Sequence, residues 1–195
     1  MPTPISPGSR RRDWRCKGDG VTPPFQRVVV IGCSGAGKST FARILGELTG
    51  LPVTHIDQLF WEPGWVMAPQ TVYLERLGAV VERETWIIEG VNASTLDLRL
   101  PRTDLVIWLD RSRWVCLWRV ARRIATSYGQ VRPDMAPGCP EQIDFEFFRY
   151  IWRFHAAYDH RIQAAIDKHG LGGRTIRIRS DREAQDYLAL LAVNS

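Results

Sequence analysis

The sequence lacks any long apolar run, and no segment approaches the roughly 18 residues that a membrane-spanning helix needs. It also lacks the charged-then-apolar start of a secretory signal, so we expect a cytoplasmic protein. The four cysteines and four histidines are scattered, without a C-x-x-C pair or two histidines at i, i+4. We therefore expect neither a disulfide framework nor a structural metal. No NKxD-like guanine motif occurs, which argues against a GTPase switch.

Positive charge gathers at the N-terminus. The formal net charge is +5, and residues 1–24 hold five basic residues against two acidic ones, so this tail carries most of that excess. Five of the twelve prolines also fall there. Such a composition does not support a packed core, and we expect residues 1–24 to be disordered. A linker, a mis-assigned start and a nucleic-acid arm all fit this tail.

Strand and helix patterns alternate through residues 25–195, which we interpret as one domain. A 45% hydrophobic content with 24% charged residues suits a globular fold with its own core. Expected strands cover 28–31, 52–56, 86–88, 105–109 and 175–179. Expected helices cover 39–48, 71–83, 112–126, an aromatic segment at 147–162, and a last helix opened by the capping box Ser180-x-x-Glu183. This alternation predicts an α/β fold of three α/β/α layers around a five-stranded parallel sheet.

The expected helix at 112–126 has two faces. One face is apolar and consists of Trp114, Leu117, Trp118 and Ala121. The opposite face is basic and consists of Arg119, Arg122 and Arg123.

A glycine-rich segment between the first strand and helix matches G-x-x-x-x-G-K-[ST] in full. With the next residue it reads Gly32, Cys33, Ser34, Gly35, Ala36, Gly37, Lys38, Ser39 and Thr40. The glycines let successive backbone N–H groups turn inward, where they and the helix N-terminus bind phosphates. Lys38 can reach the β- and γ-phosphates, and the Ser39 hydroxyl can ligate magnesium. The segment therefore predicts binding of ATP with Mg²⁺.

Magnesium needs further oxygen ligands, often through its bound waters. Asp57, Glu89 and Asp110 each follow an expected strand, and the carboxyl ends of parallel strands meet at the edge where ligands bind. We predict Ser39, Asp57 and Glu89 as the metal site. Asp110 has an alternative role as the cap of the next helix.

Several segments resemble the bacterial topology-modulation proteins, members of the adenylate-kinase-like group of P-loop proteins. The likeness spans about residues 27–190. It is carried by the segments 31–40, His55-Ile56-Asp57, Trp61-x-Pro63-Gly64-Trp65, 86–90, 96–100, 132–135 and 138–141. Where that family often has Asp-Gly-Asn-Tyr after the third strand, this chain has Glu89-Gly90-Val91-Asn92.

The resemblance implies a small kinase with an acceptor lobe at about 57–85 and a lid at about 119–145. It also implies that Arg119 and Arg123, as an R-x-x-x-R pair, act on the phosphates from the lid. Charge stabilisation by such arginines is a large part of phosphoryl-transfer catalysis, whereas the alternative for these residues is a solvated helix face.

Acceptor contacts are predicted for Asp57, Trp61 and Arg99. Arg99 could bind a phosphate or carboxylate of the acceptor, or it could be a surface charge. The same two alternatives apply to Arg102. Trp61, like Trp65, could stack on a flat ligand or pack between lobe and sheet.

Two functions follow. The first is a phosphotransferase in which Lys38, Asp57, Arg119 and Arg123 act in transfer of the γ-phosphoryl group of ATP to a nucleotide or other small acceptor. Asp57 would orient or deprotonate the acceptor hydroxyl. The alternative is a nucleotide-controlled protein with weak ATPase activity that acts on DNA topology or a regulatory partner. Neither the acceptor nor the oligomeric state can be read from the sequence.

Overall fold

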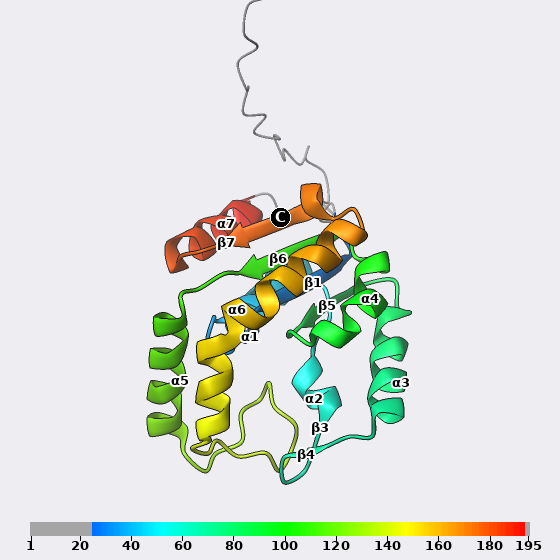
Figure 1. Cartoon of the computed structure of the whole chain (residues 1–195). Coiled ribbons are helices and arrows are strands. Elements are labelled where there is room, and N and C mark those ends of the chain that lie inside the picture. The colour runs from blue at the N-terminus through cyan, green and yellow to red at the C-terminus, as the bar shows by residue number, and fades with distance from the viewer. Residues whose placement is uncertain (1–24, 194–195) are drawn as a thin grey trace, which may run out of the picture.

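The computed structural model describes residues 25–193 and forms a twisted parallel sheet covered by helices (Figure 1). The sheet has five strands in the order β2-β5-β1-β6-β7, and every neighbouring pair is parallel. The strands are β1 (Arg27–Gly32), β2 (Val53–His55), β5 (Trp86–Glu89), β6 (Leu105–Leu109) and β7 (Thr175–Ile178). The predicted α/β fold with a five-stranded parallel sheet is confirmed.

The three central strands are continuous apolar runs because both of their faces are covered by helices. Every residue of β5 and β6 is buried, and β1 is buried from its second residue onward. β1 lies at the centre of the sheet, between β5 and β6. Its carboxyl end therefore opens between two neighbouring strand ends, where residues from all three can meet.

Helices cover both faces of the sheet. Figure 1 shows α6 crossing in front of the sheet, and α1, which contacts α7, lies behind it. The helices are α1 (Lys38–Thr49), α2 (Ile56–Phe60), α3 (Gln70–Val81), α4 (Leu96–Arg99), α5 (Arg113–Ser127), α6 (Phe145–Lys168) and α7 (Asp181–Val193). No helix between residues 25 and 193 is long and apolar enough to cross a membrane. The basic tail predicted at 1–24 lies outside the described residues.

A small hairpin follows α2. Its strands are β3 (Trp61–Glu62) and β4 (Val66–Met67), which pair antiparallel. The turn between them contains Gly64 and Trp65, which have positive φ angles of 81° and 62°. The second sheet strand ends at His55, one residue earlier than expected, because α2 begins at Ile56.

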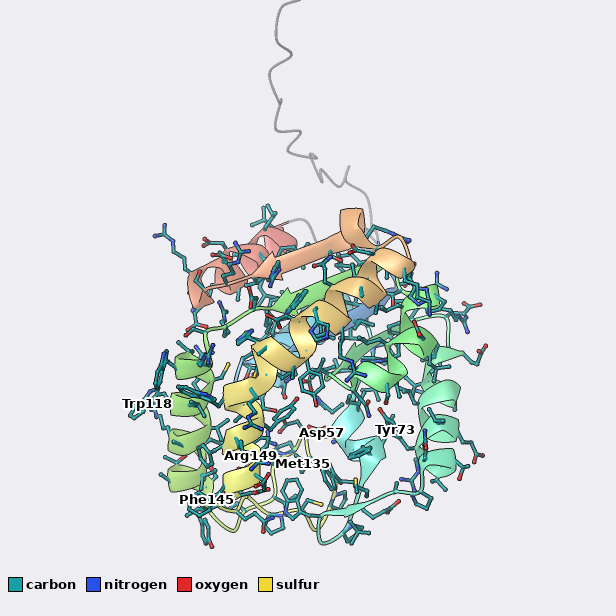
Figure 2. The ribbon with its side chains drawn as sticks, viewed as in Figure 1. Asp57, Tyr73, Trp118, Met135, Phe145 and Arg149 are labelled. Atoms are coloured by element: carbon teal, nitrogen blue, oxygen red, sulfur yellow. The ribbon has the colours of Figure 1, made fainter. Side chains whose placement is uncertain are left out.

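The apolar face predicted for α5 is largely solvent-exposed. Trp114 and Trp118 are 67% and 68% exposed, and the buried stripe is Cys116, Val120 and Ile124 instead. α5 packs closely on α6 and on the glycine-rich loop, so its inner face carries residues smaller than an indole. Figure 2 shows Trp118 on the outer side of α5.

Candidate active site

The glycine-rich loop joins β1 to α1 at the centre of the sheet. Gly35 has φ +83°, and a Cβ atom there would lie 2.5 Å from the carbonyl oxygen of Cys116 on α5. Gly37, with φ +94°, is the N-cap of α1. Both positions require glycine because their φ angles are positive, and at Gly35 there is also no space for a side chain. The loop and the helix N-terminus present the backbone N–H groups that phosphate binding needs.

Lys38 and Ser39, in the first turn of α1, lie beside Glu89 at the end of β5. The Lys38 Nζ is 3.6 Å from Glu89 Oε1, and the Ser39 hydroxyl donates to Glu89 Oε2 at 3.3 Å. His55 Nδ1 lies 2.7 Å from the same Oε2. Burial opposes ionisation of Glu89, but Lys38 and the hydrogen bond with His55 lower its pKa below the ordinary value. Glu89 is therefore a buried anion that lies between the side chains of Lys38 and His55.

Asp57 differs from Glu89 because its carboxylate has no hydrogen bond or ion pair within the described chain. It stands in the first turn of α2 and lines the cavity in front of the glycine-rich loop. Figure 2 shows it between α6 and α2. Its side chain is exposed on the side of that cavity. Partial desolvation by the surrounding protein, together with the charge of Glu89, raises the pKa of Asp57.

Asp134 is a further carboxylate at the site, and the sequence analysis did not assign it a role. It lies on the α5–α6 loop (residues 128–144), 95 positions after Ser39. Burial opposes its ionisation, yet Arg132 and a hydrogen bond with Ser39 lower the pKa of Asp134. In the sequence, Asp134 stands out only as part of segment 132–135, one of the segments that carry the family resemblance. The oxygens of Ser39, Asp57, Glu89 and Asp134 are of the kind that Mg²⁺ prefers, so these residues fit that ion.

Three arginines line the same cavity. Arg119 donates to the carbonyl oxygen of Ala36 at 3.4 Å and forms an ion pair with Asp181 at the start of α7. Arg123 lies 3.0 Å from Glu141, and Arg132 lies 2.7 Å from Asp134. Arg122, grouped with Arg119 and Arg123 in the sequence, is exposed and does not line the cavity.

The α5–α6 loop covers the cavity by binding the hairpin and α2. Gly64 N donates to Gly138 O at 2.9 Å, and Trp65 Nε1 donates to Pro140 O at 3.0 Å. Cys139, with Met135 and Ala136, packs against Trp61 and Trp65. The cavity has a volume of about 830 Å³, within the usual range for small-molecule sites.

Arg99 does not reach this cavity, which corrects the prediction that it contacts an acceptor. It is completely buried and donates to the carbonyl oxygens of Gly90, Asn92 and Thr95. It therefore supports the 90–95 segment, part of which lines the cavity. Arg102 instead forms an ion pair of 2.7 Å with Glu82.

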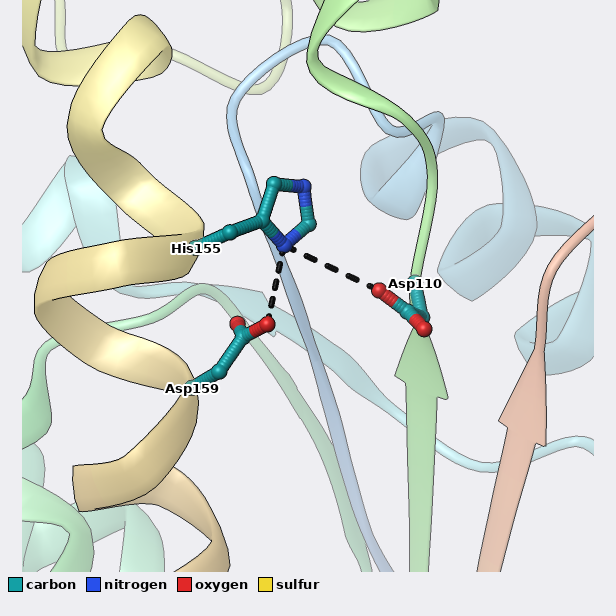
Figure 3. A group of neighbouring side chains, drawn as sticks. All are labelled: Asp110, His155 and Asp159. Carbon is teal, nitrogen blue, oxygen red and sulfur yellow. Dashed lines mark hydrogen bonds and ion pairs between the residues drawn. The ribbon is translucent and has the colours of Figure 1, made fainter.

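Asp110 also lies apart from the residues that line the cavity. Figure 3 shows it near His155 and Asp159 of α6, with His155 Nδ1 at 3.0 Å from Asp159 and 3.8 Å from Asp110. The other carboxylate oxygen of Asp110 lies 2.9 Å from Arg177. It does not cap α5, because Ser112 is the N-cap there. Asp110 is therefore part of an ion-pair cluster with His155, Asp159 and Arg177.

Comparison with solved structures supports the same fold. A shikimate kinase from Acinetobacter baumannii, solved in complex with shikimate, matches with a TM-score of 0.54 at 17% identity over 88% of this chain and 96% of that chain. A gluconokinase from Sinorhizobium meliloti 1021 gives a TM-score of 0.46 at 19% identity over 87% and 94%. No protein-family model and no curated protein matches the sequence, so membership of the topology-modulation family stays a prediction. The first likeness shows the fold of the P-loop kinases.

Proposed function

We propose that this protein is a kinase that transfers the γ-phosphoryl group of magnesium-bound ATP to a hydroxyl group of a small acceptor. The observation that carries the proposal is the carboxylate of Asp57, which has no partner among residues 25–193 and lines the same cavity as Lys38 and Ser39 of the glycine-rich loop. A kinase needs such a group to orient the attacking hydroxyl.

In this proposal each residue has a defined task. The glycine-rich loop and Lys38 bind the phosphates, while Arg119 offsets negative charge on the oxygens of the transferring group. Bound magnesium would neutralise phosphate charge, and Ser39, Asp57, Glu89 and Asp134 would hold it directly or through water. Asp57 accepts a hydrogen bond from the acceptor hydroxyl.

The reaction is an in-line displacement without a covalent enzyme intermediate. The acceptor oxygen forms a bond to the γ-phosphorus as the bond from that phosphorus to the β,γ-bridging oxygen breaks, and ADP leaves. The hydroxyl proton passes to Asp57 and then to solvent. The α5–α6 loop excludes water, which would otherwise compete as the acceptor.

The test measures ADP release with magnesium-ATP against a panel of hydroxylated metabolites, nucleosides and nucleotides. Lys38→Ala and Asp57→Asn are each expected to lower the acceptor-stimulated rate by about 100-fold or more. Asp97→Asn is the matched control, because Asp97 is exposed and pairs with Lys168 on the surface. Its rate is expected to stay within about twofold of the parent rate.

Slow hydrolysis that no acceptor stimulates would contradict the kinase proposal. That outcome would favour the alternative, a nucleotide-controlled binding protein. The basic tail that motivates this alternative lies outside the described residues, and no contact of residues 25–193 favours it.

A further inference from the structure

The cations of the cavity are all paired with carboxylates. Only four basic residues line it within the described chain: Lys38, Arg119, Arg123 and Arg132. Lys38 faces Glu89, and Arg119 is bound by Asp181. Lys38 and Arg119 also lie against the glycine-rich loop, where the phosphates of a nucleotide would use them.

The other two arginines are held by a buried carboxylate. Glu141 is only 6% exposed, and it pairs with both Arg123 and Arg132. Arg132 is further tied to Asp134. Drawing either arginine away toward an acceptor would leave Glu141 or Asp134 with less compensation in a covered site, which is strongly unfavourable. Among residues 25–193, the cavity therefore offers an anionic acceptor no basic side chain without a carboxylate partner.

The rest of the lining offers aromatic rings and uncharged polar groups. Phe60, Trp61 and Trp65 contribute rings, and the Trp61 and Trp65 centroids lie 5.4 Å apart. Asn92 has its side-chain oxygen occupied by Ser94, which leaves its amide N–H groups free to donate. Asp57 adds a carboxylate without a partner.

Trp65 is held in place at a conformational cost. Its φ of 62° lies in the left-handed region, which bulky side chains rarely adopt, and its indole N–H is fixed by Pro140 O at 3.0 Å. Strain of this kind persists where the surroundings impose it, often at ligand sites. The indole is thereby fixed at the cavity wall beside Trp61, ready to contact a ring.

We propose that the acceptor is an uncharged ring compound with hydroxyl groups, a sugar or a nucleoside, that packs on Trp61 and Trp65 and gives its reacting hydroxyl to Asp57. This inference rests on the proposed kinase function. A carboxylate or phosphate on the acceptor would lie near Asp57, where residues 25–193 offer no basic side chain without a carboxylate partner and where ATP phosphates and acidic side chains would already neutralise bound magnesium. An uncharged ring meets aromatic contact area and hydrogen-bonding groups without that penalty.

The test uses matched pairs that differ in one anionic group. The pairs are adenosine and AMP, thymidine and TMP, glucose and gluconate, and ribose and ribose 5-phosphate. Binding to the full chain is measured by calorimetry with magnesium and a non-hydrolysable ATP analogue. We expect the uncharged member of at least one pair to bind at least about tenfold more tightly than its anionic partner. The nucleoside and sugar pairs distinguish the two sources of the ring.

Two variants and one control variant identify the residues that determine this selectivity. Trp61→Ala is expected to weaken binding of the preferred compound by about tenfold or more. Trp118→Ala, which removes an exposed indole outside the cavity, is expected to leave it unchanged. Asp57→Asn is nearly isosteric and is expected to narrow the ratio between the uncharged and the anionic member. A ratio that Asp57→Asn leaves unchanged would overturn the role of Asp57 in this discrimination.

Tighter binding of the anionic members, or no binding by any uncharged member up to about 10 mM, would overturn the acceptor class. Measuring ADP release on the same pairs separates this inference from the proposed function. An uncharged compound that binds through Trp61 without being phosphorylated would support the binding class and contradict the kinase. Phosphorylation of the anionic member alone would support the kinase and contradict the class.

Discussion

Replacing Arg99 with methionine tests whether this side chain supports the cavity wall or contacts a ligand. Arg99 donates to the carbonyl oxygens of Gly90 at 2.9 Å, Asn92 at 3.2 Å and Thr95 at 3.4 Å. It has no ion-pair partner within the described chain. Methionine keeps a long flexible stem but none of the donors, so three carbonyl groups lose their partner.

The expected magnitude follows from two opposing contributions. Hydrogen bonds to a charged group contribute about 1.5–3 kcal/mol each, so three amount to roughly 5–9 kcal/mol. Complete burial lowers the pKa of Arg99 to about 10, a sign that the charge is poorly solvated. Removing that charge recovers a desolvation penalty of several kcal/mol, of the order of half the first contribution. We expect a net loss of about 2–4 kcal/mol in the free energy of unfolding.

Urea unfolding followed by circular dichroism measures this loss. Arg102→Met is the matched control, because Arg102 lies three positions on and forms only an exposed ion pair with Glu82. That control is expected to lose less than about 1 kcal/mol. A stable Arg99→Met variant with a raised KM for the acceptor would refute the structural role and restore the ligand contact predicted from sequence.

Four further predictions concern the glycine-rich loop and the carboxylates. Gly35→Ala places a methyl group 2.5 Å from the Cys116 carbonyl oxygen and is expected to weaken binding of a fluorescent ATP analogue at least about tenfold; unchanged affinity would mean that the loop accommodates a side chain. Asp134→Asn is expected to raise the magnesium concentration needed for half-maximal rate, whereas an unaltered magnesium titration would remove Asp134 from the ion site. Burial and the charge of Glu89 raise the pKa of Asp57, so kcat/KM is expected to fall with decreasing pH already above about pH 4. Because the folded state binds this proton more tightly than the unfolded state does, ionisation of Asp57 lowers stability as pH rises, and Asp57→Asn is expected to raise the Tm at neutral pH.

The fold could be predicted because its signals are local. The residues of β6 are a continuous apolar run, and the structure places that strand at the predicted residues 105–109. The match at 32–39 supplied both the phosphate loop and the strand–loop–helix order around it. Such patterns depend on a few consecutive residues, so they can be recognised without knowing the tertiary contacts.

The errors concern residues whose role depends on distant parts of the chain. Arg99 follows a strand and is basic, which suggests exposure, but three backbone carbonyls turn toward it. On α5 the larger apolar stripe is the exposed one, because closeness to the glycine-rich loop excludes Trp114 and Trp118. Asp134 lies beside Ser39 because the α5–α6 loop folds over the cavity, and this contact joins two distant parts of the chain.

That covering loop contains Pro133, Pro137 and Pro140. Two of them supply carbonyl oxygens to the opposite wall, Pro133 to Gln58 Nε2 at 2.7 Å and Pro140 to Trp65 Nε1 at 3.0 Å. Proline has few backbone conformations to lose, so the loop gives up less entropy on docking than a chain without proline would. Substituting these prolines with alanine could preserve the contacts of the docked form and still favour an open cavity. The contacts of the loop and the entropy of ordering it therefore contribute separately to how firmly it covers the cavity.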